Sequence, residues 1–180
     1  LGSDAAAGFV VWSDPQLHGF ESIAAAAIAL SANDVSTLET AVYMAIDTSL
    51  TDPSHLAKFA PCVQSAPTAA CYDEVAAKFG RVAWRRSLDA DEKARLTAIA
   101  TQAQAWGGGD FDVGLRYELS AILQSPHFVY VTEVGDAQGP QRSLTKQELA
   151  ARMSFFLLHR TPDVELLDAA DAGKLDTPEG

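Results

Sequence analysis

Residues 71–100 read CYDEVAAKFGRVAWRRSLDADEKARLTAIA, and residues 110–133 read DFDVGLRYELSAILQSPHFVYVTE. A break that contains three consecutive glycines, residues 107–109, separates the two stretches. Apolar residues recur in both at every third or fourth position, which is the period of an α-helix with one buried face. The pattern predicts three consecutive helices, arranged as a helical hairpin with a third helix laid across it.

Each of the three predicted helices has its own apolar stripe. The stripes are Val75, Phe79, Val82 and Arg86 with Ala76 and Ala83 beside them, then Leu96, Ile99, Ala103 and Trp106, and finally Phe111, Leu115, Leu119 and Ile122. Asp89 and Glu92 have the spacing of a capping box, in which two side chains satisfy free amides at a helix start. Asp110 is the predicted cap of the third helix, which we expect to end before Pro126, since proline disfavours helix at the preceding residue.

The rest of the chain also has helical periodicity. We expect helices over residues 16–30, over residues 54–59 and from Thr161 to Gly173. Another helix is expected to start at Ser36, with an apolar stripe of Leu38, Val42, Ala45 and Ile46. A further one is expected to start at Thr145, and its apolar residues are Leu149, Met153, Phe156 and Leu157. Residues 61–70 read as an irregular linker and residues 134–139 as a polar turn. The predicted fold is therefore all-α, an irregular bundle of six to seven short helices.

Composition excludes several classes of function. The chain has 180 residues, an apolar content of 48% and a formal net charge of −11. This charge argues against a nucleic-acid partner, because a phosphate binder needs a basic face, and against docking on an anionic membrane surface. The longest apolar run, residues 23–30, is far shorter than the roughly 20 residues of a membrane-spanning helix. We expect neither a nucleic-acid partner nor a membrane span.

The histidines are the first candidates for chemistry. His18, His55, His127 and His159 fall on separate predicted elements without the spacing of a metal-binding motif, so no metal site is predicted. His127 and His159 remain candidate ligands or proton donors for a redox centre. The alternative for His127 is a structural imidazole that donates to a backbone carbonyl at a helix exit.

Arg86 is the most informative charged residue, because it falls on the apolar stripe of its predicted helix. A buried guanidinium needs a carboxylate partner. The candidate partners are Glu133, Glu148 and Asp163, and the predicted role is an internal ion pair that ties the first of the three helices to later ones. The alternative is an anchor for an anionic ligand.

Three ordered blocks carry a resemblance to a known family. They are FGRVAWRRSLDADEK (residues 79–93), LSAILQSPHFVYVTE (residues 119–133) and LTKQELAARMSFFLLHRTPDVELLDAADAGKL (residues 144–175). The blocks resemble those of planctomycete-type secreted proteins of unknown function, which are linked to cytochrome c domains and are also frequent in myxobacteria. Ser87 stands where the family pattern has proline, and Val131 where it has arginine. The family has no established catalytic residues to carry over.

The resemblance has consequences for the cysteines and for the organisation of the chain. It implies a disulfide between Cys62 and Cys71 and therefore an exported, extracytoplasmic protein. The alternative is two reduced, buried cysteines. It also implies that the chain is a segment of a longer parent, with an N-terminal helical region (residues 1–60), a central three-helix unit with the cysteine loop (residues 61–140) and the start of a further helical domain (residues 141–180).

The function expected from this reasoning is a non-catalytic structural or interaction segment of a larger, cytochrome-c-associated protein. No cofactor is expected in the segment itself, although the parent could hold haem. The expected partners are the remaining domains or chains of the parent, with a c-type cytochrome as an outside candidate. The alternative is part of an extracytoplasmic haem- or metal-dependent oxidoreductase, so whether the chain serves an enzyme stays open at this point.

Overall fold

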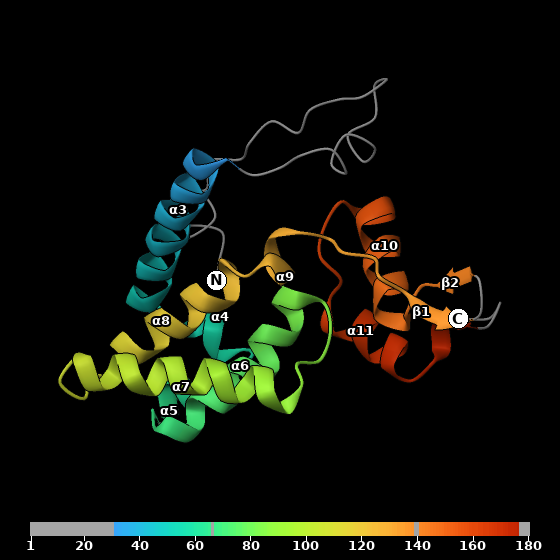
Figure 1. Ribbon diagram of the computed structural model, residues 1–180. Coiled ribbons are helices and arrows are strands. Elements are labelled where there is room, and N and C mark those ends of the chain that lie inside the picture. Colours follow the sequence, from blue (N-terminus) through green and yellow to red (C-terminus); the bar gives the residue numbers. More distant parts are fainter. Residues whose placement is uncertain (1–30, 66, 139–140, 177–180) are drawn as a thin grey trace.

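The structure is a computed structural model that describes residues 31–65, 67–138 and 141–176 (Figure 1). In these ranges, six helices of eight residues or more carry the fold: α3 (Ala32–Thr51), α6 (Ala69–Trp84), α7 (Ala90–Trp106), α8 (Phe111–Leu123), α10 (Lys146–Leu158) and α11 (Val164–Asp171). Shorter turns connect them: α4 (Ser54–Ala57), α5 (Cys62–Ser65), α9 (Pro126–Val129) and the 3-10 turn η2 (Lys174–Asp176). The all-α class is confirmed, while the helix predicted over residues 16–30 lies outside the described residues.

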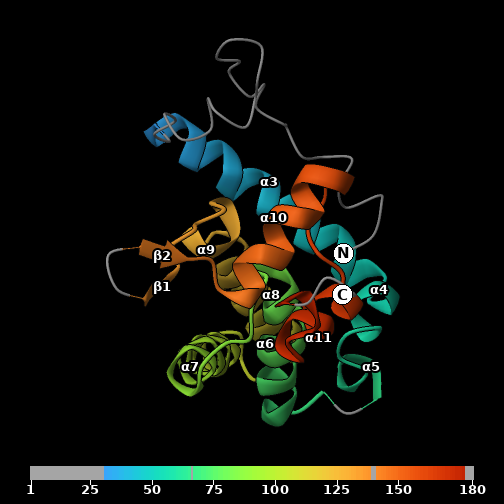
Figure 2. The same ribbon diagram turned by 90° about the vertical axis from the view of Figure 1, so that its right-hand side faces the viewer.

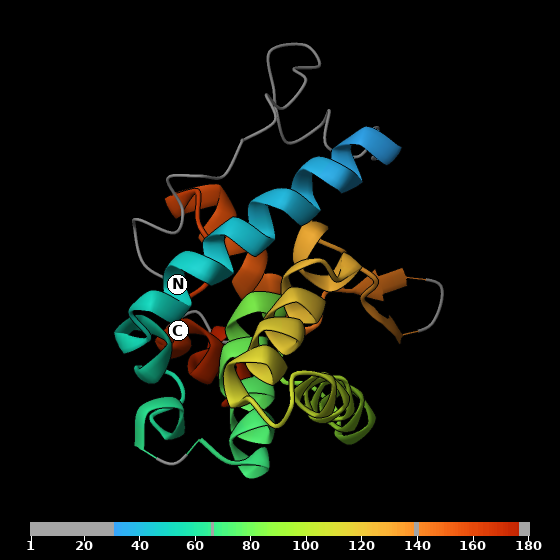
Figure 3. The same ribbon diagram turned by 90° about the vertical axis from the view of Figure 1, so that its left-hand side faces the viewer.

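Helices α6, α7 and α8 form the centre of the molecule. α7 and α8 run antiparallel and are joined by the turn at residues 107–109, α6 packs against both, and α3 crosses α8 on the other side (Figure 3). Figure 2, in which α7 is seen nearly end-on, shows α10 and α11 in front of α6 and α8, so these two helices cover one side of the central unit. The predicted three-helix unit is therefore present.

The helix starts follow the capping rule closely. Asp89 with Glu92 forms the predicted capping box, and Thr145, the predicted start of α10, forms another with Glu148. The start predicted at Ser36 is wrong, because Ser31 caps α3 five residues earlier: the Asp34 amide donates to the Ser31 hydroxyl (3.2 Å) and the Asp34 carboxylate accepts from the Ser31 amide (2.8 Å). The side chain of Ser31 already satisfies the free amides, so α3 begins there.

One continuous core joins the first helices. It contains Leu38, Val42, Ile46, Leu56, Tyr72, Val75, Phe79, Leu96, Leu115, Leu119 and Ile122, among others. The core crosses the boundary that was predicted at residue 60. On α7 the buried residues are Leu96, Ala100 and Ala103, whereas Ile99 and Trp106 are exposed, which corrects the predicted stripe. Trp106 instead lies at the end of α7, edge-to-face with Tyr117.

Helices α10 and α11 pack outside this core and bury small residues. Their buried side chains are Ala150, Ala151, Ser154, Leu167 and Ala170. Arg81 of α6 joins them to the centre, because it donates to Asp168 (2.8 Å) and Asp171 (2.7 Å) on α11. Between α9 and α10 lies a two-stranded antiparallel hairpin, β1 (Asp136–Gln138) and β2 (Gln141–Ser143), where a polar turn was expected.

The disulfide is confirmed: Cys62 and Cys71 are bonded and join the start of α5 to the first turn of α6. A covalent link across so short a loop limits the freedom of the unfolded chain and is worth about 2–3 kcal/mol in the chain-entropy description. We expect a Cys62→Ala, Cys71→Ala variant to lose about that free energy of unfolding in urea denaturation. The wild-type chain under a reductant, which keeps both sulfur atoms, is the control. Equal stability of oxidised and reduced chains would contradict this estimate.

Candidate functional site

The end of α6 turns two adjacent arginines in different directions. α6 ends at Trp84, and Arg85 has a left-handed backbone conformation (φ 59°) that breaks the helical period. Its side chain therefore enters the protein and is 8% exposed, whereas Arg86 is half-buried. The prediction that Arg86 continues the buried stripe is wrong, because it extended the helix two residues too far.

Arg85 binds the backbone of the segment that follows α8. Its Nη2 donates to the carbonyl oxygens of His127 (2.5 Å) and Tyr130 (2.8 Å), and its Nη1 to those of Phe128 (3.3 Å) and Ala83 (3.2 Å). Burial lowers the pKa of the guanidinium, but an arginine keeps its proton under such conditions. The fork of Arg85 thus satisfies carbonyls at the exit of α9 and holds this segment against α6.

Arg86 forms an ion pair with Glu92 at the start of α7. Two parallel hydrogen bonds, 2.8 and 2.7 Å long, join the guanidinium to the carboxylate. The Arg86 pair is the main reason that the pKa of Glu92 falls to about 2, and the Asp89 amide also donates to this carboxylate. The Arg86 guanidinium also lies 5.5 Å from the centre of the Trp84 ring, within range of a cation–π contact.

His127 completes this cluster. Its Nε2 lies 3.4 Å from Nη2 of Arg86 and 3.9 Å from the Glu92 carboxylate, and its ring is 4.8 Å from that of Trp84. The structure thus brings His127 to Arg86, as the two candidate residues that share one site. His159 ends α10 in a left-handed conformation and is exposed, and it does not line the cleft next to His127.

The carboxylates predicted to pair with Arg86 have other partners, so that prediction is corrected. Glu133 pairs with Arg152, and Asp163 caps α11 while lying 3.6 Å from Arg160. Glu148 accepts from the amides of Val134 (2.6 Å), Gly135 and Thr145. Arg86 pairs with Glu92 instead, because Glu92 is only six residues away in the sequence and lies in the first turn of the next helix.

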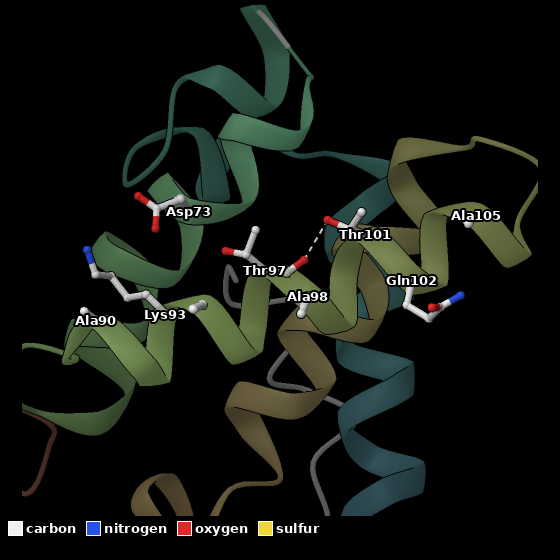
Figure 4. Close-up of a pocket in the computed structure, with 9 residues that line it drawn as sticks. Asp73, Ala90, Lys93, Thr97, Ala98, Thr101, Gln102 and Ala105 are labelled. Carbon is white, nitrogen blue, oxygen red and sulfur yellow. Dashed lines mark hydrogen bonds between the residues drawn. The ribbon is translucent and has the colours of Figure 1, made fainter.

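Among the hollows on the described surface, two are relevant to function. The first, about 340 Å³, is lined by Trp84, Arg85, Arg86, His127, Glu148 and neighbouring residues. Its ionic groups are engaged by the neighbours given above. The second, about 730 Å³, runs along α7, with Asp73 and Lys93 at one end and small residues including Thr97, Ala98 and Thr101 along it (Figure 4). The first hollow is the better candidate for a binding site, since charged and aromatic groups converge there.

Within the described part of the chain, no group of three or more histidine, cysteine, aspartate or glutamate side chains is placed to hold a metal ion. The same residues include no helix long and apolar enough to cross a membrane.

Glu118 is a feature that sequence reasoning missed. It lies on α8 and is 0% exposed, and within the described part of the chain neither carboxyl oxygen has a hydrogen-bond partner. Burial, with a smaller contribution from Asp73, raises the pKa of Glu118 to about 9. The signal in the sequence is that Glu118 follows Leu115 by three positions and precedes Ile122 by four, so it falls on the apolar stripe.

The end of α10 has large apolar side chains on its surface. Phe156, Leu157 and Leu158 are consecutive and are 79%, 64% and 54% exposed. The residues that α10 buries are Ala150, Ala151 and Ser154, all in its earlier turns. The helix therefore buries small residues and exposes three large apolar ones at its end.

Comparison with known proteins gives two family matches. Residues 71–133 match the family described as "PSD5: Protein of unknown function (DUF1595)", and residues 144–180 match "PSD4: Protein of unknown function (DUF1592)". The first match spans α6 to α9 with the Arg85 and Arg86 cluster, and the second includes α10 and α11. No curated protein and no solved structure matches the chain.

Proposed function

We infer that this chain is a non-catalytic helical segment of a larger exported, cytochrome-c-associated protein of unknown function, and that the end of α10 contacts another part of that protein. The observation that carries this proposal is the exposure of Phe156, Leu157 and Leu158. The two family matches are consistent with the unknown function in this proposal, since both families are described as having unknown function.

Helix geometry supports a contact on more than one side of α10. Successive helix residues point about 100° apart, so three consecutive apolar residues cover more than half of the circumference. A helix that is apolar on all sides is normally buried on all sides. Apolar patches of this kind on a folded surface mark interaction sites. We therefore place the partner around the last turn of α10.

The partner that fits best is a remaining domain or chain of the parent protein. Apart from Leu167, the residues that α10 and α11 bury are small, so this pair lacks a large core of its own, and further packing would supply one. A c-type cytochrome is the outside candidate. Exported context is supported by the disulfide, which persists in oxidising compartments.

The second candidate, part of a haem- or metal-dependent oxidoreductase, is favoured by the position of His127 beside Trp84 at the 340 Å³ cleft. Soret absorbance and metal analysis of the purified chain separate the two. A stoichiometric haem or metal that is lost in a His127→Ala variant would replace the scaffold proposal.

A triple variant tests the α10 contact. Each large apolar side chain is worth about 1.5–3 kcal/mol when it is buried. Phe156→Gln, Leu157→Gln and Leu158→Gln together should therefore raise the undocked fraction of α10 at least about a hundredfold. Tryptic cleavage after Arg160, which is exposed in the 180-residue chain, is the measurement. In the protein isolated from its source, cleavage should be slow in the wild type and fast in the variant.

The 180-residue chain itself supplies the control. Because the three side chains are exposed, the variant should keep the unfolding midpoint of the wild-type chain. Met44→Gln on α3, at a position that is 54% exposed, is the matched variant and should leave the cleavage rate unchanged. Rapid cleavage after Arg160 in the wild-type source protein would contradict the proposal.

A further inference from the structure

Glu118 is buried where three helices meet. It projects from α8, the helix that packs against α6, α7 and α3, and its side chain has no exposure and no hydrogen-bond partner among the residues that the structure describes. Gly114, one turn earlier on the same face, lies against Tyr72 of α6 and the carbonyl of Ala100 on α7. The carboxyl group is therefore enclosed between α8 and these two helices.

The groups around Glu118 do not compensate a negative charge. From α6, Asp73 acts on it with the same sign, and Tyr72 donates its hydroxyl to the Phe111 carbonyl (3.0 Å) instead. The residues that α7 buries are Leu96, Ala100 and Ala103, and the buried hydroxyl of Thr97 does not titrate in this range.

Two basic residues on α8 and α9 have partners of their own. Arg116 on α8 pairs with Asp47 of α3, and His127 of α9 belongs to the cluster with Arg86 and Glu92. No cation contributes to the pKa of Glu118, which burial and Asp73 both raise. A buried carboxylate without a partner is strongly unfavourable, so the folded state favours the neutral acid.

We propose that Glu118 is a proton-operated lock on the three-helix unit. While the carboxyl group is protonated, α8 stays packed against α6 and α7. When it loses its proton, the charge must reach water, and water enters only if α8 separates from its neighbours. This proposal is independent of the docking role of α10.

The direction of the pH dependence follows from linkage. The pKa of Glu118 is about 9 in the folded state, against the ordinary glutamate value of 4.5 that applies to the unfolded chain. The folded state thus binds the extra proton, and its advantage is complete below pH 4.5 and is lost as the pH rises toward 9. Between these values the opening constant should rise about tenfold per pH unit.

Two measurements on the same sample test the lock. In chain labelled with 13C at the glutamate carboxyl carbons, the Glu118 signal, identified by its absence in Glu118→Gln, should titrate with a midpoint above pH 8. The opening constants of α8 amides, from hydrogen exchange corrected for intrinsic rates, should rise about a thousandfold between pH 5 and 8 relative to Glu118→Gln. Glu39→Gln, at an exposed mid-helix position on α3, should behave like the wild type.

Two results would overturn the proposal. The first is a Glu118 carboxyl that titrates near its ordinary value in the folded wild-type chain. The second is a midpoint above pH 8 with no loss of amide protection, because the charge would then form without separating the helices. If Glu118→Gln does not fold, the Glu118 carboxyl signal is assigned instead by its through-bond correlation to the backbone of Glu118, and the wild-type opening constants at pH 5 and pH 8 are compared with each other, so both readings then come from the wild-type chain alone.

Discussion

Gly114→Ala should destabilise the chain by about 3 kcal/mol, as a case of overpacking in a closely packed core. A Cβ atom at this position would clash with the Tyr72 hydroxyl, far inside van der Waals contact, and would lie 2.6 Å from Cζ of Tyr72 and 2.7 Å from the backbone oxygen of Ala100. Tyr72 cannot withdraw, because it is fully buried and stacked on Phe111 at 4.7 Å. α7 and α8 must move apart to accept the methyl group.

Gly80→Ala is the matched control, since Gly80 is also a buried helical glycine. Its added Cβ would meet only the tip of the Leu88 side chain, at 3.2 and 3.3 Å. The gain in helix propensity, about 1 kcal/mol, should offset that contact and leave stability nearly unchanged. Urea denaturation of both variants is the measurement.

A double-mutant cycle sharpens the test. Tyr72→Phe removes the hydroxyl that the new methyl group would strike, so Gly114→Ala should cost at least about 1 kcal/mol less in that background. Equal losses in the two glycine variants, or strict additivity with Tyr72→Phe, would contradict the close approach of α7 and α8.

The second large effect is expected at Arg85. Arg85→Met should cost about 3 kcal/mol, because it leaves the carbonyls of His127, Phe128 and Tyr130 without their donor. Arg85→Lys should recover only part of this loss. The ammonium group can donate to some of the carbonyls, but it lacks the planar fork that reaches several of them at once. Urea denaturation gives the free energy, and the fluorescence of Trp84, which lies against His127, reports on the segment itself.

Arg86→Met is the control for Arg85. Its ion pair with Glu92 is partly exposed, so its loss should cost about 1 kcal/mol or less. If Arg86→Met were the more damaging substitution, the assignment of Arg85 as the residue that holds the α9 segment would be wrong.

Arg85 and Arg86 show which parts of the structure the sequence could predict and which it could not. Helical period and capping boxes predicted α6, α7, α8 and α10, because those signals are local. The sequence could not reveal that Arg85 adopts a left-handed conformation, since the conformation depends on carbonyls that come from residues more than forty positions later. Extending α6 by two residues, to Arg86, then exchanged the roles of Arg85 and Arg86.

The same reasoning applies to the exposed and buried exceptions. Phe156 and Leu157 were recognised as apolar, but their exposure depends on what packs around α10, which periodicity does not contain. Glu118 was missed for the opposite reason, because a charged residue inside an apolar stripe is usually taken as solvated. Glu118 and the exposed apolar residues of α10 all break the helical pattern, and the proposals made for this protein rest on them.

Site-specific photo-crosslinking tests the proposed contact of α10 most directly. A photoreactive benzophenone amino acid is placed at position 156 in the source protein, in its own cells, and at the exposed position 95 on α7 as the control. Our account predicts one dominant adduct from position 156, mapped to one segment of the parent polypeptide or of its stable partner chain, and none from position 95. No adduct at position 156, or the same scattered adducts at both positions, would contradict it.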